Sequence, residues 1–347
     1  MSSVNIADLK FYGSANMPDA DGATTGGAVD FTKKIDFTDP ASAGSFNYVS
    51  SSASDTAVTI AVSGRDATGV AVTETKTLTG TTPVAGSQSF ERLLKGVAGG
   101  SAAVGDIAVI SATKVVSAHT AQAGSANPTG TSPPVMKLAS GDKASVSVGQ
   151  IIRATGGTGA NQLREIISID AGLGTDVVAL NRPWSTVPDA TTTYDVHNGM
   201  LFDLGPSQIT QVRRPFYNAA ADVPGGSTKT YYEKIFAVNT NTSTAATSAS
   251  IAKAIDPATG VYQVALTNSL NDTGTVANRQ TAPSSGITAF TSGSAPQTIN
   301  VPSPQNLPSG ATPNSAGAQG VWLSLQLAAG LAPAKTSVAN QVNWQTT

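Results

Sequence analysis

The sequence predicts an all-β protein with two β-sandwich modules, immunoglobulin-like or jelly-roll-like, and a small β-barrel module between them. Short runs of Val, Ile and Thr alternate with small polar residues, which is the period of half-buried strands. Gly, Pro, Asn and Asp separate these runs, as expected of tight turns. The chain has 347 residues, and because domains usually hold about 100–200 residues, we expect more than one module.

The first predicted module, an N-terminal β-sandwich, covers residues 1–118. In the run 57–63, Val and Ile occupy every second position, so one face of this strand is expected in the core. A turn at 64–69 and a second run at 70–78 complete a predicted hairpin. The segment 90–94 fits either a short helix or a strand.

A Gly-, Ser-, Thr- and Pro-rich segment, 119–134, is typical of a linker. The small barrel is expected at 135–203. At about 70 residues it is near the lower size limit for independent folding, so we expect it to depend on its neighbours. Its predicted strands are 150–154, 164–169, 176–180 and 194–196.

The third predicted module is a C-terminal β-sandwich at 205–347. Its expected strands are 231–238, 249–254, 261–266 and 321–327. Between the last two lies a long loop, 268–318, dominated by Ser, Thr, Pro, Asn and Gly. A loop of this length is usually functional or an extended arm.

A weak internal repeat links the two ends of the chain. Phe11-Tyr12 followed by Lys33-Lys34-Ile35 has a counterpart in Phe216-Tyr217 followed by Glu233-Lys234-Ile235. The pattern fits a duplicated sandwich with the barrel inserted between the copies. Chance similarity in a chain of low complexity is the alternative.

Charge and cysteine content exclude several functional classes. Charged residues make up 12% of the chain, and 20 basic against 22 acidic residues give a net charge of −2. No basic run is present, which argues against nucleic-acid binding. The chain has no Cys, so disulfides and thiolate metal sites are excluded. Without a signal-peptide pattern or a long apolar run, we expect synthesis in a bacterial cytoplasm and no membrane span.

No pattern predicts catalysis, a metal or a cofactor. His119 lies in the predicted linker and His197 precedes an Asn-Gly turn, so both are expected on the surface. Asp19 and Asp21 lack the further ligands of a calcium loop. The Gly-rich segment 156–160 leads into a strand and lacks the Lys and helix of a phosphate-binding loop. We therefore expect a non-enzymatic protein.

The candidate partner contacts are few. Residues 1–16, with Ile6, Leu9, Phe11 and Tyr12, form either a docking arm or the first strand of the sandwich. The pair Arg213-Arg214 is either a solvated edge or an anchor on an acidic partner. Trp184, Trp322 and Trp344 are expected in module cores or contacts, and Trp344, close to the end of the sequence, is a candidate for burial in a partner.

Several segments resemble a group of tailed-bacteriophage virion proteins that includes capsid decoration, or cement, proteins. In residues 149–195 the resemblance lies in a Gly-Thr-Gly-Ala turn, a Gln-x-Arg strand, Arg182-Pro183-Trp184 and a Pro-Asp-Ala-Thr turn. Four further segments show it: 63–84, 231–238, 278–283 and 319–332.

The resemblance implies a virion structural protein that stabilises the outside of a capsid by binding the major capsid protein. Decoration sites on icosahedral shells are usually threefold, so a homotrimer is expected. Four alternatives are a tail-fibre or receptor-binding module, a neck or tail-tube component, a bacterial surface adhesin and, last, an enzyme.

Overall fold

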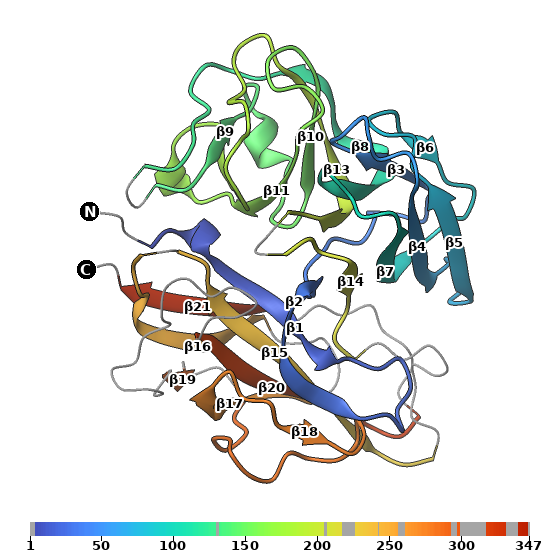
Figure 1. Cartoon of the computed structure of the whole chain (residues 1–347), viewed down its shortest axis with the longest axis vertical. Coiled ribbons are helices and arrows are strands. Elements are labelled where there is room, and N and C mark those ends of the chain that lie inside the picture. Colours follow the sequence, from blue (N-terminus) through green and yellow to red (C-terminus); the bar gives the residue numbers. More distant parts are fainter. Residues whose placement is uncertain are drawn as a thin grey trace. The chain divides into compact units, whose positions relative to one another are not determined.

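A computed structural model describes residues 4–129, 132–204, 207–216, 226–241, 243–255, 261–292, 297–298, 317–330 and 339–345. The predicted all-β class is confirmed: 52% of the chain is strand and 3% is helix. The helical residues described form three short 3-10 turns, Ile6–Asp8 (η1), Asp142–Ala144 (η2) and Ala171–Leu173 (η3). Figure 1 shows the strands in chain order.

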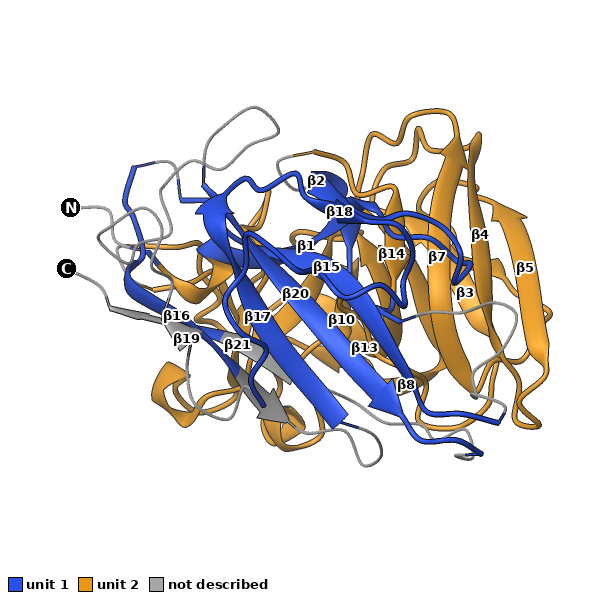
Figure 2. Cartoon of the chain, turned by 90° about the horizontal axis from the view of Figure 1, so that it is seen from below, with its two compact units in different colours: residues 1–4, 8–35, 214–347 blue, residues 5–7, 36–213 orange. Residues whose placement is uncertain are grey.

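The chain divides into two compact units, coloured separately in Figure 2. Unit 1 contains residues 1–4, 8–35 and 214–347, and unit 2 contains residues 5–7 and 36–213. The first 35 residues therefore belong mainly with the C-terminal part of the chain. The predicted linker does not separate two bodies, since the segments on both sides of it belong to unit 2.

Unit 2 contains an eight-stranded antiparallel sheet in the order β6-β3-β8-β13-β10-β11-β12-β9. Its strands are β3 Phe46–Ser50, β6 Val84–Ala85, β8 Ile107–Thr120, β9 Val135–Lys137, β10 Ile151–Gly156, β11 Leu163–Ser168, β12 Val177–Leu180 and β13 Thr193–Phe202. The expected strands at 150–154, 164–169, 176–180 and 194–196 are therefore present. Trp184 is buried in the hydrophobic cluster of this sheet, as predicted.

Four further antiparallel strands of unit 2 are neighbours in the order β14-β7-β4-β5. They are β4 Val58–Arg65, β5 Ala71–Thr77, β7 Arg92–Gly100 and β14 Gln211–Arg213. The hairpin predicted at 57–78 is confirmed by the register of β4 against β5. The segment 90–94 runs into strand β7, so its strand alternative is the correct one.

Unit 1 is built on five neighbouring strands, β17-β20-β15-β1-β2, with β18 paired to β2. A smaller sheet has the order β19-β16-β21. The strands are β1 Leu9–Asn16, β2 Thr25–Lys34, β15 Lys229–Asn239, β16 Thr247–Ile255, β17 Val261–Leu270, β18 Thr275–Val276, β19 Gln297–Thr298, β20 Ala318–Leu327 and β21 Ala339–Gln345. The four strands predicted for the third module are all found. Trp322 is buried in this unit, as predicted.

Strand β1 explains why the first residues belong to unit 1. It pairs along one side with β15, Phe11 lying opposite Ala237, and along the other side with β2. Phe11-Tyr12 of the first copy of the internal repeat lies in β1 and Lys33-Lys34 in β2, while Glu233-Lys234-Ile235 of the second copy lies in β15, on the other side of β1 in the same sheet. Residues 217–225 of the second copy lie outside the described residues.

The segment 268–318, predicted as a loop, contains paired residues where it is described. β18 pairs with β2, and residues 286–291 run beside β17 through the bridges Thr267–Ile287 and Val264–Thr291. Residues 299–316 lie outside the described part of the chain.

Candidate functional site

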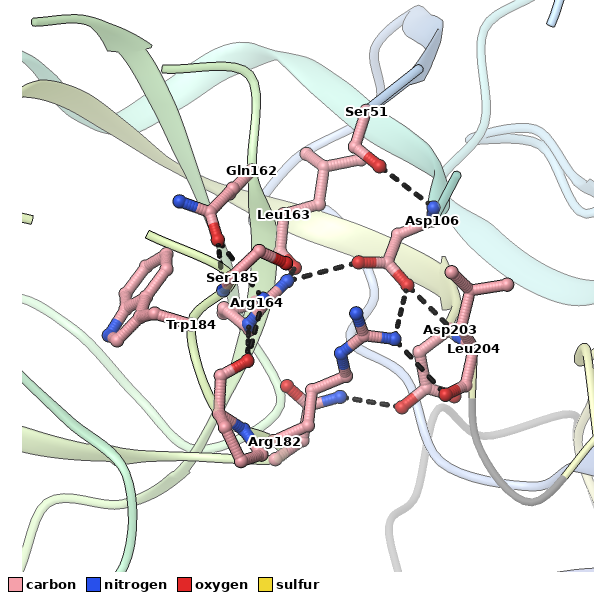
Figure 3. Close-up of polar contacts among 12 residues, drawn as sticks. Ser51, Asp106, Gln162, Leu163, Arg164, Arg182, Trp184, Ser185, Asp203 and Leu204 are labelled. Atoms are coloured by element: carbon pink, nitrogen blue, oxygen red, sulfur yellow. Dashed lines mark hydrogen bonds and ion pairs between the residues drawn. The ribbon is translucent and has the colours of Figure 1, made fainter. Parts of the chain in front are cut away.

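Unit 2 contains a buried ionic cluster, drawn in Figure 3. It gathers side chains from strand ends that are far apart in the sequence. Asp106 precedes β8, Arg164 lies in β11, Asn181 and Arg182 follow β12, and Asp203 follows β13. We call these five residues the Arg164 cluster. Charged side chains are rarely buried unless paired, so their partners decide what the cluster does.

The guanidinium of Arg164 has a partner for each of its hydrogens. Its Nη1 donates to Asp106 Oδ2 at 3.0 Å and to Leu163 O at 2.6 Å. Its Nε and Nη2 donate to Pro183 O, and Nη2 also donates to Gln162 Oε1. The group also lies 5.1 Å from the centre of the Trp184 ring. Arg164 therefore has no donor left for a ligand.

Both oxygens of Asp106 are also engaged. Oδ1 accepts hydrogen bonds from Arg182 Nη1 and from the Leu204 N–H, both at 2.9 Å. Burial raises the pKa of Asp106, and the two guanidinium groups oppose this effect. Burial, together with repulsion from Arg182, lowers the pKa of Arg164 to about 10. Arg164 therefore remains charged at neutral pH.

Asn181 extends the cluster across the sheet. Its Oδ1 accepts from the Glu165 N–H at 2.9 Å, and its Nδ2 donates to Asp203 Oδ2 at 2.6 Å. The cluster thus links the ends of β8, β11, β12 and β13. The polar atoms described above form hydrogen bonds within the protein. We therefore interpret the cluster as a structural element that holds the strand ends together rather than as a binding site.

An imidazole, a carboxylate and a phenol form a second polar group in unit 2. His119 Nδ1 lies 2.9 and 2.8 Å from the two carboxylate oxygens of Asp142. The Tyr194 hydroxyl donates to the same carboxylate and accepts from the Ala139 N–H. Burial, followed by the Asp142 interaction, raises the pKa of Tyr194. A carboxylate on Nδ1 orients an imidazole. Here the contact between His119 and Asp142 also connects the end of β8 to η2.

The predicted surface position of His197 is wrong. This side chain is 2% exposed, and its Nδ1 lies 2.8 Å from Ser111 O. The Asn198-Gly199 pair that suggested a turn lies inside β13, where the register against β8 shifts. Gly199 has a φ of 151° and packs against the Val109 carbonyl, so the pair forms an irregularity within the strand.

Unit 1 also buries charges, which composition did not predict. Lys234 Nζ donates to the carbonyl oxygens of Gly27, Asp272 and Gly274 and lies 3.3 Å from Asp272 Oδ1. Burial lowers the pKa of Lys234, and Asp272 opposes this shift. Arg279 Nε lies 3.0 Å from Glu233 Oε1, and both side chains are fully buried.

The predicted partner contacts lie in different environments. Tyr12 is 2% exposed against the Phe31 ring, while Leu9 and Phe11 pack on the core cluster of unit 1. Residues 9–16 thus form an internal strand. Ile6, in η1, is 36% exposed and is the accessible apolar residue of this group.

The basic pair and the terminal Trp complete the set of predicted contacts. Arg213 is fully buried, so it is not part of a solvated edge, and Arg214 is half-buried. Trp344 lies in β21, which pairs with β16, and its side chain is outside the described residues.

A group of small, uncharged outward residues on β4 and β5, bordered by Arg65 of β4 and Lys95 of β7, is a surface feature that sequence analysis missed. On β4, Thr59, Ala61 and Ser63 point away from the buried Val58, Ile60 and Val62. They lie opposite Thr77, Thr75 and Thr73 of β5 respectively, and these three threonines are exposed. We call these six outward residues the threonine face. The alternation at 57–63 could have predicted its small, uncharged composition.

The comparisons give no relatives: no family model matches the chain, and neither the curated proteins nor the solved structures include a match. Among the described residues, no group of three or more His, Asp or Glu side chains is placed to hold a metal ion. No helix within the described ranges is long and apolar enough to cross a bilayer.

Proposed function

We propose that this chain is a non-enzymatic structural protein of a tailed-phage virion that decorates the capsid exterior and binds the major capsid protein. The threonine face carries the proposal. It combines exposed Thr73, Thr75 and Thr77 with small residues of β4, and the nearest charges on the same side of the sheet are those of Lys95 and Arg65 at its border. Interface centres are depleted in charged residues, because desolvating a charge is costly.

The buried ion pairs support the same proposal. In this charge-poor chain, Arg164, Lys234 and Arg279 are buried, together with the acidic partners Asp106 and Glu233. The resemblance to virion proteins is the basis for proposing the capsid location, the major capsid protein as partner and a homotrimer. A protein that stabilises a shell needs a rigid body and a surface that can be covered at little electrostatic cost.

Immunogold labelling of intact virions with an antibody against the folded chain tests the location. We expect gold over the whole head. Gold confined to the neck or tail tip would contradict decoration and favour the tail alternatives, and virions without label would contradict the virion assignment.

Binding to the shell is tested by adding purified protein to capsids that lack it. The Ala61→Lys variant places a charge on the threonine face without altering the buried face of β4. We expect co-sedimentation of the native chain and weaker binding of the variant. Lys143→Ala is a surface control, because Lys143 lies in η2 and not on the strands of the threonine face. Equal binding by all three proteins would exclude the threonine face as the contact.

A further inference from the structure

Strand β5 is an open sheet edge. It pairs with β4 on one side, and in the described part of the chain no strand pairs with its other side. Both views show β5 at the margin of its sheet (Figures 1 and 2). An unpaired edge presents backbone N–H and C=O groups that can pair with another chain.

Two other sheet edges in the described residues are covered. The outer side of β17 receives Thr291 and Ile287 through two bridges, and β9 is bridged at Val135 to Ala126. β5 has no comparable cover. Its seven residues contain neither Pro nor Gly, and its register against β4 runs without a bulge. Pro and bulges are devices that usually protect an edge from pairing. The two charges of β5, Glu74 and Lys76, can also protect an edge, but they form an ion pair with each other at 3.1 Å.

The hydrogen-bond pattern identifies which residues face the open edge. Leu78 N–H donates to Val58 O, directly after the printed register in which Thr77 lies opposite Thr59. In an antiparallel pair, alternate residues direct their backbone groups toward the neighbouring strand. The outward groups therefore belong to Ala71, Thr73, Thr75 and Thr77.

We infer that β5 pairs antiparallel with β5 of a second copy of this chain, with Thr75 at the twofold axis. In this register Thr75 lies opposite Thr75, and Thr73 lies opposite Thr77, so each pair uses outward backbone groups. A twofold contact of this kind is self-complementary and closed. Cross-strand Thr pairs also stabilise antiparallel sheets.

Charge selects this register over its neighbours. With Thr75 opposite Thr75, Glu74 of each copy lies across from Lys76 of the other. A shift that places Thr73 opposite Thr75 brings the two Glu74 side chains together, and the opposite shift brings the two Lys76 side chains together. Like charges directly opposite are destabilising. Within one copy Lys76 Nζ lies 3.1 Å from Glu74 Oε1, and the Glu74 carboxylate, 4% exposed, also accepts hydrogen bonds from the Ser87 N–H and the Tyr48 hydroxyl. The contact across the axis is therefore made by the more exposed Lys76.

The inference is independent of the proposed function, since it concerns two copies in solution. A trimer formed through another surface would still present β5, and such trimers would associate in pairs. Sedimentation of the full chain is therefore expected to show a dimer or another even-numbered assembly. A species that remains monomeric or trimeric over the whole soluble concentration range would overturn the inference.

Two sets of variants test the edge and the register. Thr75→Pro removes an outward N–H, so we expect dissociation into half-sized species with an unchanged circular dichroism spectrum. If this variant does not fold, cysteine cross-linking decides, because the chain has no other Cys. Facing residues at the axis have Cα atoms roughly 5.5 Å apart, within disulfide range.

The matched cysteine variants are Thr73→Cys and Thr77→Cys. Each of these residues would lie about 14 Å along the strand from the same residue of the second copy, at about 3.4 Å per residue. Mild oxidation should therefore cross-link Thr75→Cys efficiently and both control variants poorly and equally. Cross-linking that is strongest at position 73 or 77, or absent at 75, would overturn the proposed register.

Discussion

Arg164 and Asp106 are 58 positions apart in the sequence, yet Nη1 of one lies 3.0 Å from Oδ2 of the other. The Arg164 side chain is 1% exposed and that of Asp106 is 3% exposed. Because the pair joins β11 to the start of β8, it holds together two strands that are not neighbours in the sheet. Its removal should affect the whole of unit 2.

Replacing Arg164 with Met should destabilise unit 2 by about 3–5 kcal/mol, the usual cost of breaking a buried ion pair by removing one partner. Asp106 would keep Arg182 but lose the fully buried partner. Urea unfolding followed by circular dichroism and Trp fluorescence measures the change, and Trp184 reports locally because it stacks on Arg164.

The matched control is Arg182→Met. The Arg182 side chain is 19% exposed and more easily replaced by water, so its loss should cost about 1 kcal/mol, near the range of exposed pairs. An equal loss of unfolding free energy in the two variants would show that the buried Arg164 stabilises unit 2 no more than the partly exposed Arg182 does.

The lowered pKa of Glu74 predicts that the folded protein loses stability in acid. Burial pushes its pKa upward, but hydrogen bonds from the Ser87 N–H and hydroxyl, together with Lys76 and Tyr48, outweigh this and lower the pKa below the ordinary 4.5. A carboxylate with a lowered folded-state pKa stabilises the fold fully above 4.5 and loses this contribution as pH falls through the folded value.

The Glu74→Gln variant tests this predicted direction of the pH dependence of stability. It should be less stable at pH 7 by about 1–2 kcal/mol, the cost of weakening hydrogen bonds to a buried charged acceptor. The difference between the two proteins should shrink as the pH falls from 5 toward 3. A difference that stays constant across this range would contradict the role of ionised Glu74.

Local patterns allowed most strands to be predicted. The alternation of Val58, Ile60 and Val62 defined β4, and the following turn residues defined its hairpin with β5. Here the partners are adjacent in sequence, so periodicity and turn chemistry are sufficient.

Long-range pairing could not be predicted in the same way. Phe11 pairs opposite Ala237, a relationship that leaves no periodic trace in either segment. The buried charges were missed for a related reason. A lone Arg164 or Lys234 in a strand predicts an exposed side chain, and only the folded chain brings their partners together.

His197 adds a second pH effect nearer neutrality. Burial lowers its pKa below 6.5, although the Ser111 carbonyl favours the charged form. The unfolded chain therefore takes up a proton at a higher pH than the folded chain does. The stability contribution is complete above pH 6.5 and declines by up to about 1.4 kcal/mol per pH unit below it.

Thermal unfolding between pH 7.5 and 5.5 measures this decline. His197→Asn retains a donor near the Ser111 carbonyl but cannot titrate, so it should flatten the slope in this range. His119→Asn removes the other imidazole of the chain and should leave the contribution of His197 in place. A slope that survives the His197 substitution would assign the effect to other groups.

Lys234 provides the corresponding test in unit 1. Its ammonium lies 5.0 Å from the Phe236 ring centre and 5.7 Å from that of Trp322, and it donates to three backbone carbonyls. Replacement by Met would keep the aliphatic stem but leave those carbonyls without their donor. We expect a loss of about 2–4 kcal/mol, since several buried acceptors lose a charged donor at once.

Hydrogen exchange should show the loss locally, because the bonded carbonyls of Gly27 and Gly274 lie beside the β2–β18 pairing. Amides of β2 and β18 should exchange faster in Lys234→Met than in Lys229→Met, which changes a half-buried Lys at the start of the same strand. If both variants exchange equally, the hydrogen bonds from Lys234 do not hold β18 to the sheet. Faster exchange confined to Lys234→Met would show that one buried ammonium fixes a two-residue strand too short to be stable by its own pairing.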